Sequence, residues 1–512
     1  MPAGTLLVAG TGSNVGKTTL VAGLCRLLRR RGVLVAPFKA QNMSLNSCVT
    51  ADGAEIARAQ ALQAQAAGVE PEAAMNPVLL KPGSDTRSHL IVLGRPAGEV
   101  GSAAYAEARQ SLLATVVEAH ASLRQRFDVV LCEGAGSPAE INLRDGDIAN
   151  LGFARAADVP VLLVGDIDRG GVLASLAGTL ALLSPDDQDL IQGYVVNRFR
   201  GDQRLLQPGL DALSERTGLR CYGVLPNLPW LRLDAEDSLA AAAWPEPGRP
   251  VGTEMLRVAV IRFPYASNMT DIDPLAAEPG VIIRLVTRPT ELSDADLVIL
   301  PGTRATLADL RWLRDRGFEP AIREHHSAGR PVLGICGGYQ MLGERIEDGV
   351  ESRETAAEGL GLLPVHTRFH PGKILARQSR QLSCGTVTGY QIHHGHVQPH
   401  GGTPFFADEG CQDAGVAGTT WHGLFEHDEF RRTYLTTVAA QSGRQFTAAT
   451  ATRFAAIREA QLDRLADALA ENLDVTGIEQ IIGGRPRPRT TVELRLLPRA
   501  VAASTAGHVT AR

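Results

Sequence analysis

The stretch AGTGSNVGKTT, residues 9–19, sets the fold of the amino-terminal half of the chain. It follows the apolar run TLLVA at 5–9 and precedes a stretch with helical character, so it predicts a glycine-rich turn between a strand and a helix. Backbone N–H groups of such a turn, at the N-terminus of a helix, cradle phosphate oxygens. We therefore predict a nucleotide site with ATP as its co-substrate.

The spacing of this turn differs from that of a standard P-loop. GxxxxGK[ST] would require glycine where Thr11 lies, yet Lys17 can still meet the β- and γ-phosphates and the Thr18 hydroxyl can hold Mg²⁺. Asn197, at the end of the run GYVVN, could read an adenine edge or could simply end a strand. A glycine-rich turn without nucleotide is the alternative, and Gly-Lys-Thr argues against it. The predicted nucleotide-binding residues are Gly10, Thr11, Gly12, Gly16, Lys17, Thr18 and Asn197.

A carboxylate is expected beside the phosphate site. CEGAG, residues 132–136, places Glu133 at the end of a β-rich run, where it could meet a Mg²⁺ ion held by Thr18. Asp52, in the turn TADG, is a weaker second candidate for the metal. For either residue the plain alternative is a solvated surface carboxylate.

The chain alternates strands and helices in two series, which predicts an α/β fold with two domains built on parallel sheets. An amphipathic stretch at 451–481 is expected to close the second domain. Residues 234–254 mix acids, proline and glycine without a period and are the expected linker. The predicted strands lie at 5–9, 129–132, 160–164 and 193–197, then at 257–262, 281–286, 297–300 and 331–335. The predicted units are domain 1–233, linker 234–254, domain 255–483 and a flexible tail at 484–512.

Composition excludes several classes of protein. The chain has 512 residues, of which 44% are hydrophobic, so it can bury cores for two or three domains. A net charge of −5 gives no electrostatic footprint for nucleic acid or an anionic membrane. No apolar run has the length of a membrane span and the start of the chain does not read as a signal peptide, so we expect a cytoplasmic protein. Its seven cysteines lack CxxC pairs and predict reduced thiols.

The second domain contains an unusual cysteine. In GICGG, residues 334–338, Cys336 lies between glycines directly after an apolar run, which predicts the sharp strand-to-helix turn of a nucleophile elbow. The helix N-terminus would favour the thiolate. The backbone N–H of Gly337 and a second donor from Gly302 or Thr303, in the turn LPGT, could form an oxyanion hole. A buried structural cysteine is the alternative.

A thiol nucleophile needs a base, and several histidines compete for that role. His422 lies in TWHGLFEHDEF, whereas GYQIHHGH offers His393, His394 and His396. The partners of a catalytic cysteine are neighbours in space rather than in sequence, so spacing alone leaves the choice open.

Two family resemblances bear on these choices. The form GTxSxVGKT resembles the dethiobiotin synthetase branch of P-loop proteins, and the second half resembles a class I glutamine amidotransferase, which implies a flavodoxin-like α/β domain after a P-loop parallel-sheet domain. The latter resemblance implies a histidine on a late loop and favours His422 over His393. It departs at Leu424, where the class carries a glutamate that orients the histidine, and the cobalamin-pathway branch shows a similar gap. Glu426 could orient His422 only if its loop curls back.

Longer segments resemble those of the cobyric acid synthase family, over nearly the whole chain from residue 4 to about 480. The resemblance implies an ATP- and glutamine-dependent ligase that amidates the b, d, e and g carboxylates of adenosylcobyrinic acid a,c-diamide, with Mg²⁺ and no bound organic cofactor. Asp147 and Asp145, in NLRDGD, are carried over as acceptor-side residues, with Asp147 preferred; solvated loop acids are the alternative. The segments are APFKAQNMSLNS (36–47), MNPVLLKP (75–82), EGAGSPAEINLRDGDIANLG (133–152), GDIDRGGVLASL (165–176) and VVNRFRGD (195–202).

Two other functions stay open on the residues alone. Another glutamine-dependent ligase, of the a,c-diamide synthase type or a cell-wall amidating relative, would share both motifs and differ in its acceptor pocket. The chain could instead be a P-loop switch ATPase of the partitioning type with a decayed amidotransferase domain. Its ATP turnover would then be controlled by a macromolecular partner, and it would lack glutaminase chemistry.

Overall fold

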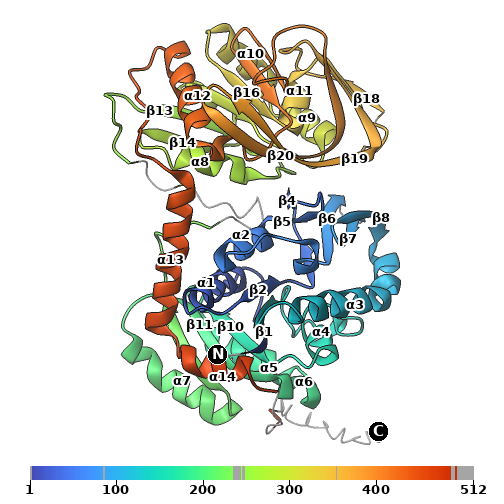
Figure 1. Cartoon of the computed structure of the whole chain (residues 1–512), viewed down its shortest axis with the longest axis vertical. Coiled ribbons are helices and arrows are strands. Elements are labelled where there is room, and N and C mark those ends of the chain that lie inside the picture. Colours follow the sequence, from blue (N-terminus) through green and yellow to red (C-terminus); the bar gives the residue numbers. More distant parts are fainter. Residues whose placement is uncertain are drawn as a thin grey trace, which may run out of the picture.

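The computed structural model describes residues 3–84, 87–233, 244, 248–352, 355–485 and 491–492. Two α/β bodies are stacked along the long axis of the molecule (Figure 1). Most of the expected linker at 234–254 and most of the expected tail at 484–512 lie outside the described residues. Within the described part of the chain, no helix combines the length and the apolar character needed to cross a membrane.

The first domain is built on a six-stranded sheet in the order β12-β11-β10-β1-β9-β2, and every neighbouring pair is parallel. Strands β1, β9 and β10 are buried along their whole length, as expected of a sheet covered on both faces. The carboxyl ends of parallel strands meet at one edge, where the segments after β1, β2 and β9 come together with Asn197 of β11. The strands are β1 (Gly4–Gly10), β2 (Val35–Phe38), β9 (Val129–Glu133), β10 (Val161–Asp166), β11 (Ile191–Phe199) and β12 (Arg220–Pro226).

Helices cover both faces of this sheet, and two small sheets lie on the side that faces the second domain (Figure 1). One small sheet has the order β3-β6-β7-β8, and the other is the hairpin β4–β5. The helices are α1 (Lys17–Arg30), α2 (Arg58–Ala67), α3 (Ser102–Arg124), α4 (Leu151–Ala156), α5 (Val172–Ala181), α6 (Pro185–Leu190) and α7 (Gln203–Thr217). The small strands are β3 (Gln41–Met43), β4 (Ser47–Val49), β5 (Glu55–Ala57), β6 (Val78–Ser84), β7 (Arg87–Val92) and β8 (Arg95–Gly101).

The second domain has its own six-stranded sheet, in the order β14-β13-β15-β16-β22-β21, parallel except for the edge strand β21. The predicted α/β class and two-domain sheet plan are thus confirmed. The strands are β13 (Leu256–Ile261), β14 (Val281–Val286), β15 (Leu297–Leu300), β16 (Val332–Ile335), β21 (Cys411–Asp413) and β22 (Val416–Thr419). The helices are α8 (Asp273–Ala276), α9 (Thr306–Asp315), α10 (Phe318–Ser327), α11 (Gly337–Leu342) and α12 (Asp428–Gln441).

A long hairpin of the second domain reaches the first. It is formed by β19 (Val365–Leu382) and β20 (Gly385–Pro399), in a four-stranded sheet with β17 (Arg345–Glu347) and β18 (Ala356–Glu358). Both hairpin strands contact β4 of the first domain. The hairpin therefore joins the two bodies directly, and the sequence analysis did not anticipate it.

The helical region after residue 451 packs differently from our expectation. Helices α13 (Phe454–Asn472) and α14 (Val475–Ile482) cover the first domain rather than closing the second (Figure 1). Leu462, Leu465 and Leu469 of α13 lie in one buried cluster with residues of β1 and α1, and Arg26 of α1 forms ion pairs with α13. The amphipathic pattern predicts that one face of the helix is buried, but it does not predict which domain that face packs against.

Candidate active sites

The P-loop holds its predicted shape through close packing at Gly16. This residue has a left-handed φ of 99° at the start of α1, and a Cβ atom there would lie 2.1 Å from Asn197 Nδ2. Asn197 in turn donates to Val15 O at 2.9 Å. Glycine is therefore required at this position. The geometry brings Asn197 to the loop, whereas its adenine-reading role stays a prediction.

Lys17 lies between two glycine-rich turns. Its Nζ donates to Gly12 O at 2.9 Å and to Gly136 O at 3.0 Å, which places the ammonium between the P-loop and the loop after β9. Thr11 anchors the start of the P-loop, because its N–H donates to Val164 O at 3.0 Å. The cation is thus positioned where a phosphate held by the loop would meet it.

Glu133 is buried beside Thr18, as the sequence predicted. Its Oε1 accepts hydrogen bonds from the Thr18 hydroxyl and from Lys39 Nζ, both at 2.8 Å, and its Oε2 accepts one from Gln63 Nε2 at 2.6 Å. The Thr18 hydroxyl and the Glu133 carboxylate are hard oxygen ligands on adjoining elements, so they fit Mg²⁺. Sequence reasoning missed Lys39 and Gln63. Lys39 follows β2, the parallel neighbour of β9, and that pairing was not predicted.

The other acids predicted for this site have different neighbours. Asp52 lies exposed in the turn between β4 and β5, where its carboxylate accepts from the Thr50 hydroxyl and its carbonyl oxygen accepts from Arg95. The hydrogen-bond partners of Asp52 are therefore Thr50 and Arg95, and not Thr18 or Glu133. The TADG turn is an ordinary tight turn whose aspartate hydrogen-bonds locally.

Asp147 is engaged by backbone amides. Its Oδ1 accepts from the N–H groups of Ala149 and Asn150, and its Oδ2 accepts from Gly152 N–H, each at 2.9 Å. Asn150 then bonds both ways with the backbone of Ala135, in the loop after β9. Asp147 thus anchors the frame of that loop. Asp145 is exposed in the same segment, and the acceptor-side role of both acids stays a prediction.

In the second domain, Cys336 occupies a strained turn between β16 and α11. Its φ of 50° and ψ of −109° are rarely adopted by residues other than glycine. A Cβ at Gly334 would lie 2.6 Å from Tyr339 N, and one at Gly338 would lie 1.9 Å from Leu300 O. The glycines therefore permit the close approach of strand and helix that leaves Cys336 at the tip of the turn, as predicted.

His422 lies next to Cys336, and Asp271 lies next to His422, which is the order that a Cys–His–Asp triad would require. His422 lines the same small cavity as Cys336, and its Nδ1 lies 2.7 Å from Asp271 Oδ2. Asp271 Oδ1 also accepts from Gly423 N–H at 2.8 Å, which fixes the carboxylate. Burial alone would lower the pKa of His422, but the Asp271 carboxylate and then Cys336 raise it well above its usual range. The imidazolium form is therefore favoured next to the sulfur.

The residue that orients His422 is Asp271 and not Glu426. Glu426 forms ion pairs with Arg58 at 2.6 Å and with Arg458 at 3.4 Å. Asp271 escaped the sequence analysis because it lies in a 3₁₀ turn, η4 (Met269–Ile272), with no motif around it. One signal was available: parallel strands β13, β15, β16 and β22 bring the segments that follow them to one edge of the sheet.

The predicted oxyanion donors lie beside Cys336. A Cβ at Gly337 would lie 3.1 Å from Thr303 N, and one at Gly302 would lie 3.1 Å from His422 Cε1. Gly337 therefore lies next to Thr303, and Gly302 lies next to His422, while their role as donors to a developing oxyanion stays a prediction.

His393, the rejected candidate for the base, lies in the same small cavity as Cys336 and His422. Burial lowers the pKa of His393 to about 4, so it is neutral near pH 7. Its Nδ1 lies 2.7 Å from Gly395 O, and its buried Nε2 has no hydrogen-bond partner within the described ranges. This cavity, of about 30 Å³, also has Lys81 of the first domain and Lys373 of the second in its wall.

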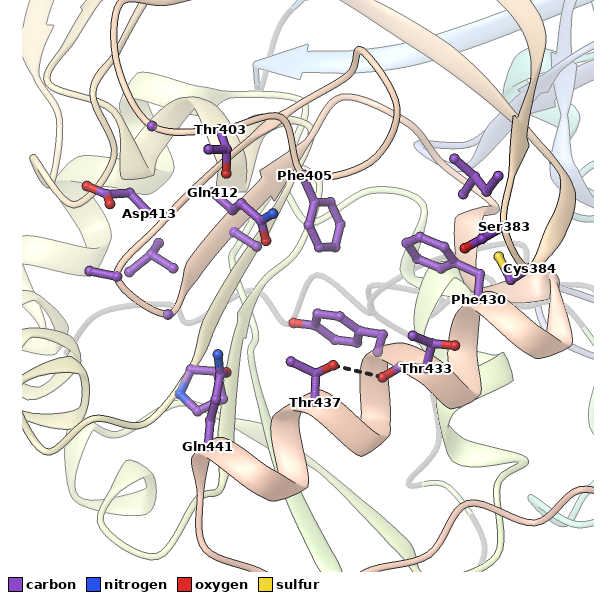
Figure 2. Close-up of a pocket in the computed structure, with 18 residues that line it drawn as sticks. Ser383, Cys384, Thr403, Phe405, Gln412, Asp413, Phe430, Thr433, Thr437 and Gln441 are labelled. Atoms are coloured by element: carbon purple, nitrogen blue, oxygen red, sulfur yellow. Dashed lines mark hydrogen bonds between the residues drawn. The ribbon is translucent and has the colours of Figure 1, made fainter.

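A larger cavity, of about 540 Å³, lies elsewhere in the second domain (Figure 2). Its wall includes Phe405, the turn at Ser383 and Cys384, and Phe430 of α12. It contains none of the residues predicted for either site. Size alone therefore does not locate the chemistry in this molecule.

Comparison with known proteins identifies a family for each half of the chain. Residues 6–239 match the family model described as the CobQ/CobB/MinD/ParA nucleotide binding domain, and residues 257–430 match the CobB/CobQ-like glutamine amidotransferase domain. The chain is 56% identical to the cobyric acid synthase of Streptomyces avermitilis over 94% of this chain and 96% of the relative. The chain belongs to the cobyric acid synthase family.

Other members of the cobyric acid synthase family are similar to this chain over nearly the same length. The protein of Frankia casuarinae is 56% identical over 94% of this chain and 96% of the relative, and that of Mycolicibacterium paratuberculosis is 54% identical over 96% and 99%. As a member of the family, this chain is a ligase that forms carbon–nitrogen bonds with glutamine as amido donor.

Proposed function

We propose that this chain converts the b, d, e and g carboxylates of adenosylcobyrinic acid a,c-diamide into amides and so produces adenosylcobyric acid. ATP and glutamine are the co-substrates. The observation that carries the proposal is the pairing of two sites within one chain: Lys17, Thr18 and Glu133 in the first domain, and the Cys336–His422–Asp271 triad in the second. Family membership over nearly the full length supports the choice of acceptor.

The first half-reaction releases ammonia. Cys336 Sγ attacks the side-chain amide carbon of glutamine, and the oxygen becomes an anion near the N–H groups of Gly337 and Thr303. His422, held by Asp271, gives its proton to the departing nitrogen as the carbon–nitrogen bond breaks. Water then cleaves the glutamyl thioester, which returns the thiol and yields glutamate.

The second half-reaction activates the acceptor. An oxygen of the corrinoid carboxylate attacks the γ-phosphorus of ATP, the bond to ADP breaks, and an acyl phosphate forms. Lys17 lies where it can meet the transferring phosphoryl group. Thr18 and Glu133 would hold Mg²⁺, which supplies charge stabilisation when bound. Ammonia then attacks the acyl carbon and phosphate leaves.

An intact triad favours this function over a P-loop switch with a decayed amidotransferase domain. Decay would leave the strained turn at Cys336 and the buried ion pair of His422 with Asp271 without a purpose, and both cost folding free energy. The alternative of another glutamine-dependent ligase differs only in the acceptor.

The test is a panel of acceptors offered with ATP and glutamine, followed by mass spectrometry that counts the carboxylates converted into amides. We expect adenosylcobyrinic acid a,c-diamide to gain amides until all four positions are converted, with ADP formed in step. Cobyrinic acid that gains amides only at its a and c positions would instead support the a,c-diamide synthase type. ATP hydrolysis without any amidation would contradict the proposal.

A further inference from the structure

The first domain contributes a segment to the surroundings of the triad. This segment, residues 44–57, contains the turn before β4 and the hairpin β4–β5, and we call it the bridging segment. Its hairpin lies at the top of the lower body, below the β19–β20 hairpin (Figure 1). Three kinds of contact join it to the amidotransferase domain.

The first contact is a reciprocal pair of asparagines, Asn46 and Asn268. The Asn268 N–H donates to Asn46 Oδ1 at 2.7 Å, and Asn268 Oδ1 accepts from the N–H of Ser47 at 3.0 Å. Both side chains are buried. Each amide thus satisfies a backbone donor of the other domain, and the loss of one side chain leaves a buried N–H unpaired.

Asn268 belongs to the turn that carries the triad carboxylate. It has a left-handed φ of 53° and directly precedes η4, and its carbonyl oxygen accepts from Asp271 N–H at 3.1 Å. The pair with Asn46 therefore fixes the start of the turn whose third residue is Asp271. A displacement of Asn268 moves the carboxylate that holds His422.

The second contact is apolar and lies behind the other two triad residues. Cys48, Val49 and Ile56 of the bridging segment form one buried cluster with Tyr390 and Ile392 of β20. Tyr390 is stacked on the His422 ring at 5.3 Å and pairs with its backbone, and Ile392 O lies 4.0 Å from Cys336 Sγ.

The third contact is a buried ionic cluster. Glu55 of the bridging segment accepts from Lys81 of its own domain and from Lys373 of the other, each at 2.5 Å. Burial would raise the pKa of Glu55, but Lys373 and Lys81 hold it far below its usual range. The cluster keeps the two domains in one register next to the Cys336 cavity.

The bridging segment is also fixed to the nucleotide site. Asn46 O accepts from the N–H of Arg58, the first residue of α2, at 3.1 Å. One and a half turns along the same helix, Gln63 donates to Glu133 at 2.6 Å. A short helix behaves as a rigid unit, so Asn46 and the Glu133 carboxylate belong to one frame.

We propose that Asn46 and Asn268 are positioning residues for glutamine hydrolysis: through this pair, the first domain holds Asp271 in place against His422. The triad is thereby complete only when the two domains are docked in the observed register. This inference rests on the proposed role of Cys336, His422 and Asp271.

The test compares Asn46→Ala and Asn268→Gly with wild type. Glycine is used at position 268 because it accepts the left-handed φ without strain. We expect kcat for glutamine hydrolysis to fall on the order of tenfold in each variant, because one buried hydrogen bond is lost. The KM for glutamine should change little, because the substitutions leave the substrate pocket intact. Ammonia-dependent synthesis should stay near the wild-type rate.

Three controls separate positioning from a general loss of structure. Asn46→Asp and Asn268→Asp keep the acceptor oxygen and should restore most of the kcat. Glu70→Gln breaks an exposed ion pair with Arg377 between the same domains and should leave glutamine hydrolysis unchanged. The double variant of Asn46 and Asn268 should be no slower than the worse single variant, because the two side chains act as one unit.

The outcomes distinguish this inference from the proposed function. If Cys336→Ala abolishes glutamine hydrolysis while Asn46→Ala and Asn268→Gly keep the wild-type kcat, the positioning role is wrong and the proposed triad stands. If Cys336→Ala itself keeps full hydrolysis, the proposed triad is wrong. A fall in kcat that neither aspartate variant reverses would also overturn the positioning role.

Discussion

The two ends of this molecule build their sites in opposite ways. At the nucleotide end, the loop, its lysine and its hydroxyl come from one continuous stretch, residues 10–18, and one distant carboxylate, Glu133, completes the group. At the glutaminase end, Asp271, Cys336 and His422 come from three separate segments that only the sheet brings to one edge. A site built from one continuous stretch can be recognised in the sequence, whereas a site assembled from separate segments cannot.

The two ends also differ in how they handle charge. Around Glu133, Lys39, the Thr18 hydroxyl and the Gln63 amide donate to the carboxylate, at a site that is predicted to receive anionic phosphates. Around His422, the imidazolium is buried between a carboxylate and a thiol, and there the balance of charge sets the protonation state. Variants at the first end should therefore impair both nitrogen sources, and variants at the second should impair glutamine alone.

The largest effect that sharpens this contrast is expected at Lys17. Lys17→Ala removes a preorganised cation from the transferring phosphoryl group, so synthesis should fall on the order of 10²-fold or more with glutamine and with ammonia alike. Glutamine hydrolysis without acceptor should change little. Rates with each nitrogen source, measured side by side, check this. An unchanged ammonia-dependent rate would refute the phosphate role of Lys17.

The next effect is expected at Asp271. Asp271→Asn keeps the shape but removes the charge, and a slowing of glutamine hydrolysis on the order of 10²-fold is expected because the imidazolium loses its partner. Asp271 raises the pKa of His422, so its loss lowers that pKa and the imidazolium deprotonates at lower pH. The alkaline limb of the pH profile for glutamine hydrolysis should move toward lower pH.

Ammonia-dependent synthesis by Asp271→Asn is the internal control and should match wild type. An alkaline limb that moved upward, or equal losses with both nitrogen sources, would contradict the assignment of Asp271.

A smaller effect is expected at Asp147. Asp147→Asn removes one acceptor and faces a backbone N–H with an amide donor, which should lower the free energy of unfolding by about 1–2 kcal/mol. The loosened loop should slow ammonia-dependent synthesis with partly amidated products accumulating, and should spare glutamine hydrolysis. Thermal unfolding together with product distribution over time measures both. A wild-type product distribution together with wild-type stability would show that Asp147 is only a solvated loop acid.

The smallest effect is expected at Glu426. Glu426→Gln breaks partly exposed ion pairs with Arg58 and Arg458, and such pairs contribute about 0–1 kcal/mol. Glutamine hydrolysis should therefore change less than about threefold, against the much larger loss in Asp271→Asn. A loss as large as that of Asp271→Asn would mean that Glu426 shares the task of orienting His422.

Much of the fold was predictable because buried parallel strands have apolar sequences between helical stretches. The strands that end at Glu133 and at Ile335 were both expected, together with the residues placed after them. Helix α13 was expected as an element, but its partner surface was not, because an apolar stripe fits either domain. Contacts between segments hundreds of residues apart depend on the tertiary structure and cannot be predicted from local sequence.

The sites follow the same rule. Lys17, Thr18 and Cys336 lie in motifs whose residue types match the chemistry predicted for them, so each could be predicted from its own segment. His422 was preferred to His393 only through the resemblance to class I glutamine amidotransferases. Asp271 and Lys39 act only through neighbours far along the chain, and nothing in their local sequence marks them. Asp52 shows the converse case: the structure gives it a hydrogen bond within its own turn, and its metal role stays a prediction.

The central claim is that nitrogen released at Cys336 in one domain reaches a carboxylate activated in the other. The most direct test supplies glutamine labelled with ¹⁵N in its amide, together with ATP, the corrinoid acceptor and unlabelled ammonium, and reads the label in the product by mass spectrometry. We predict that the wild-type product carries ¹⁵N, and that Cys336→Ala still forms product but entirely from ammonium. Labelled product from Cys336→Ala, or unlabelled product from wild type while glutamine is being hydrolysed, would contradict the claim.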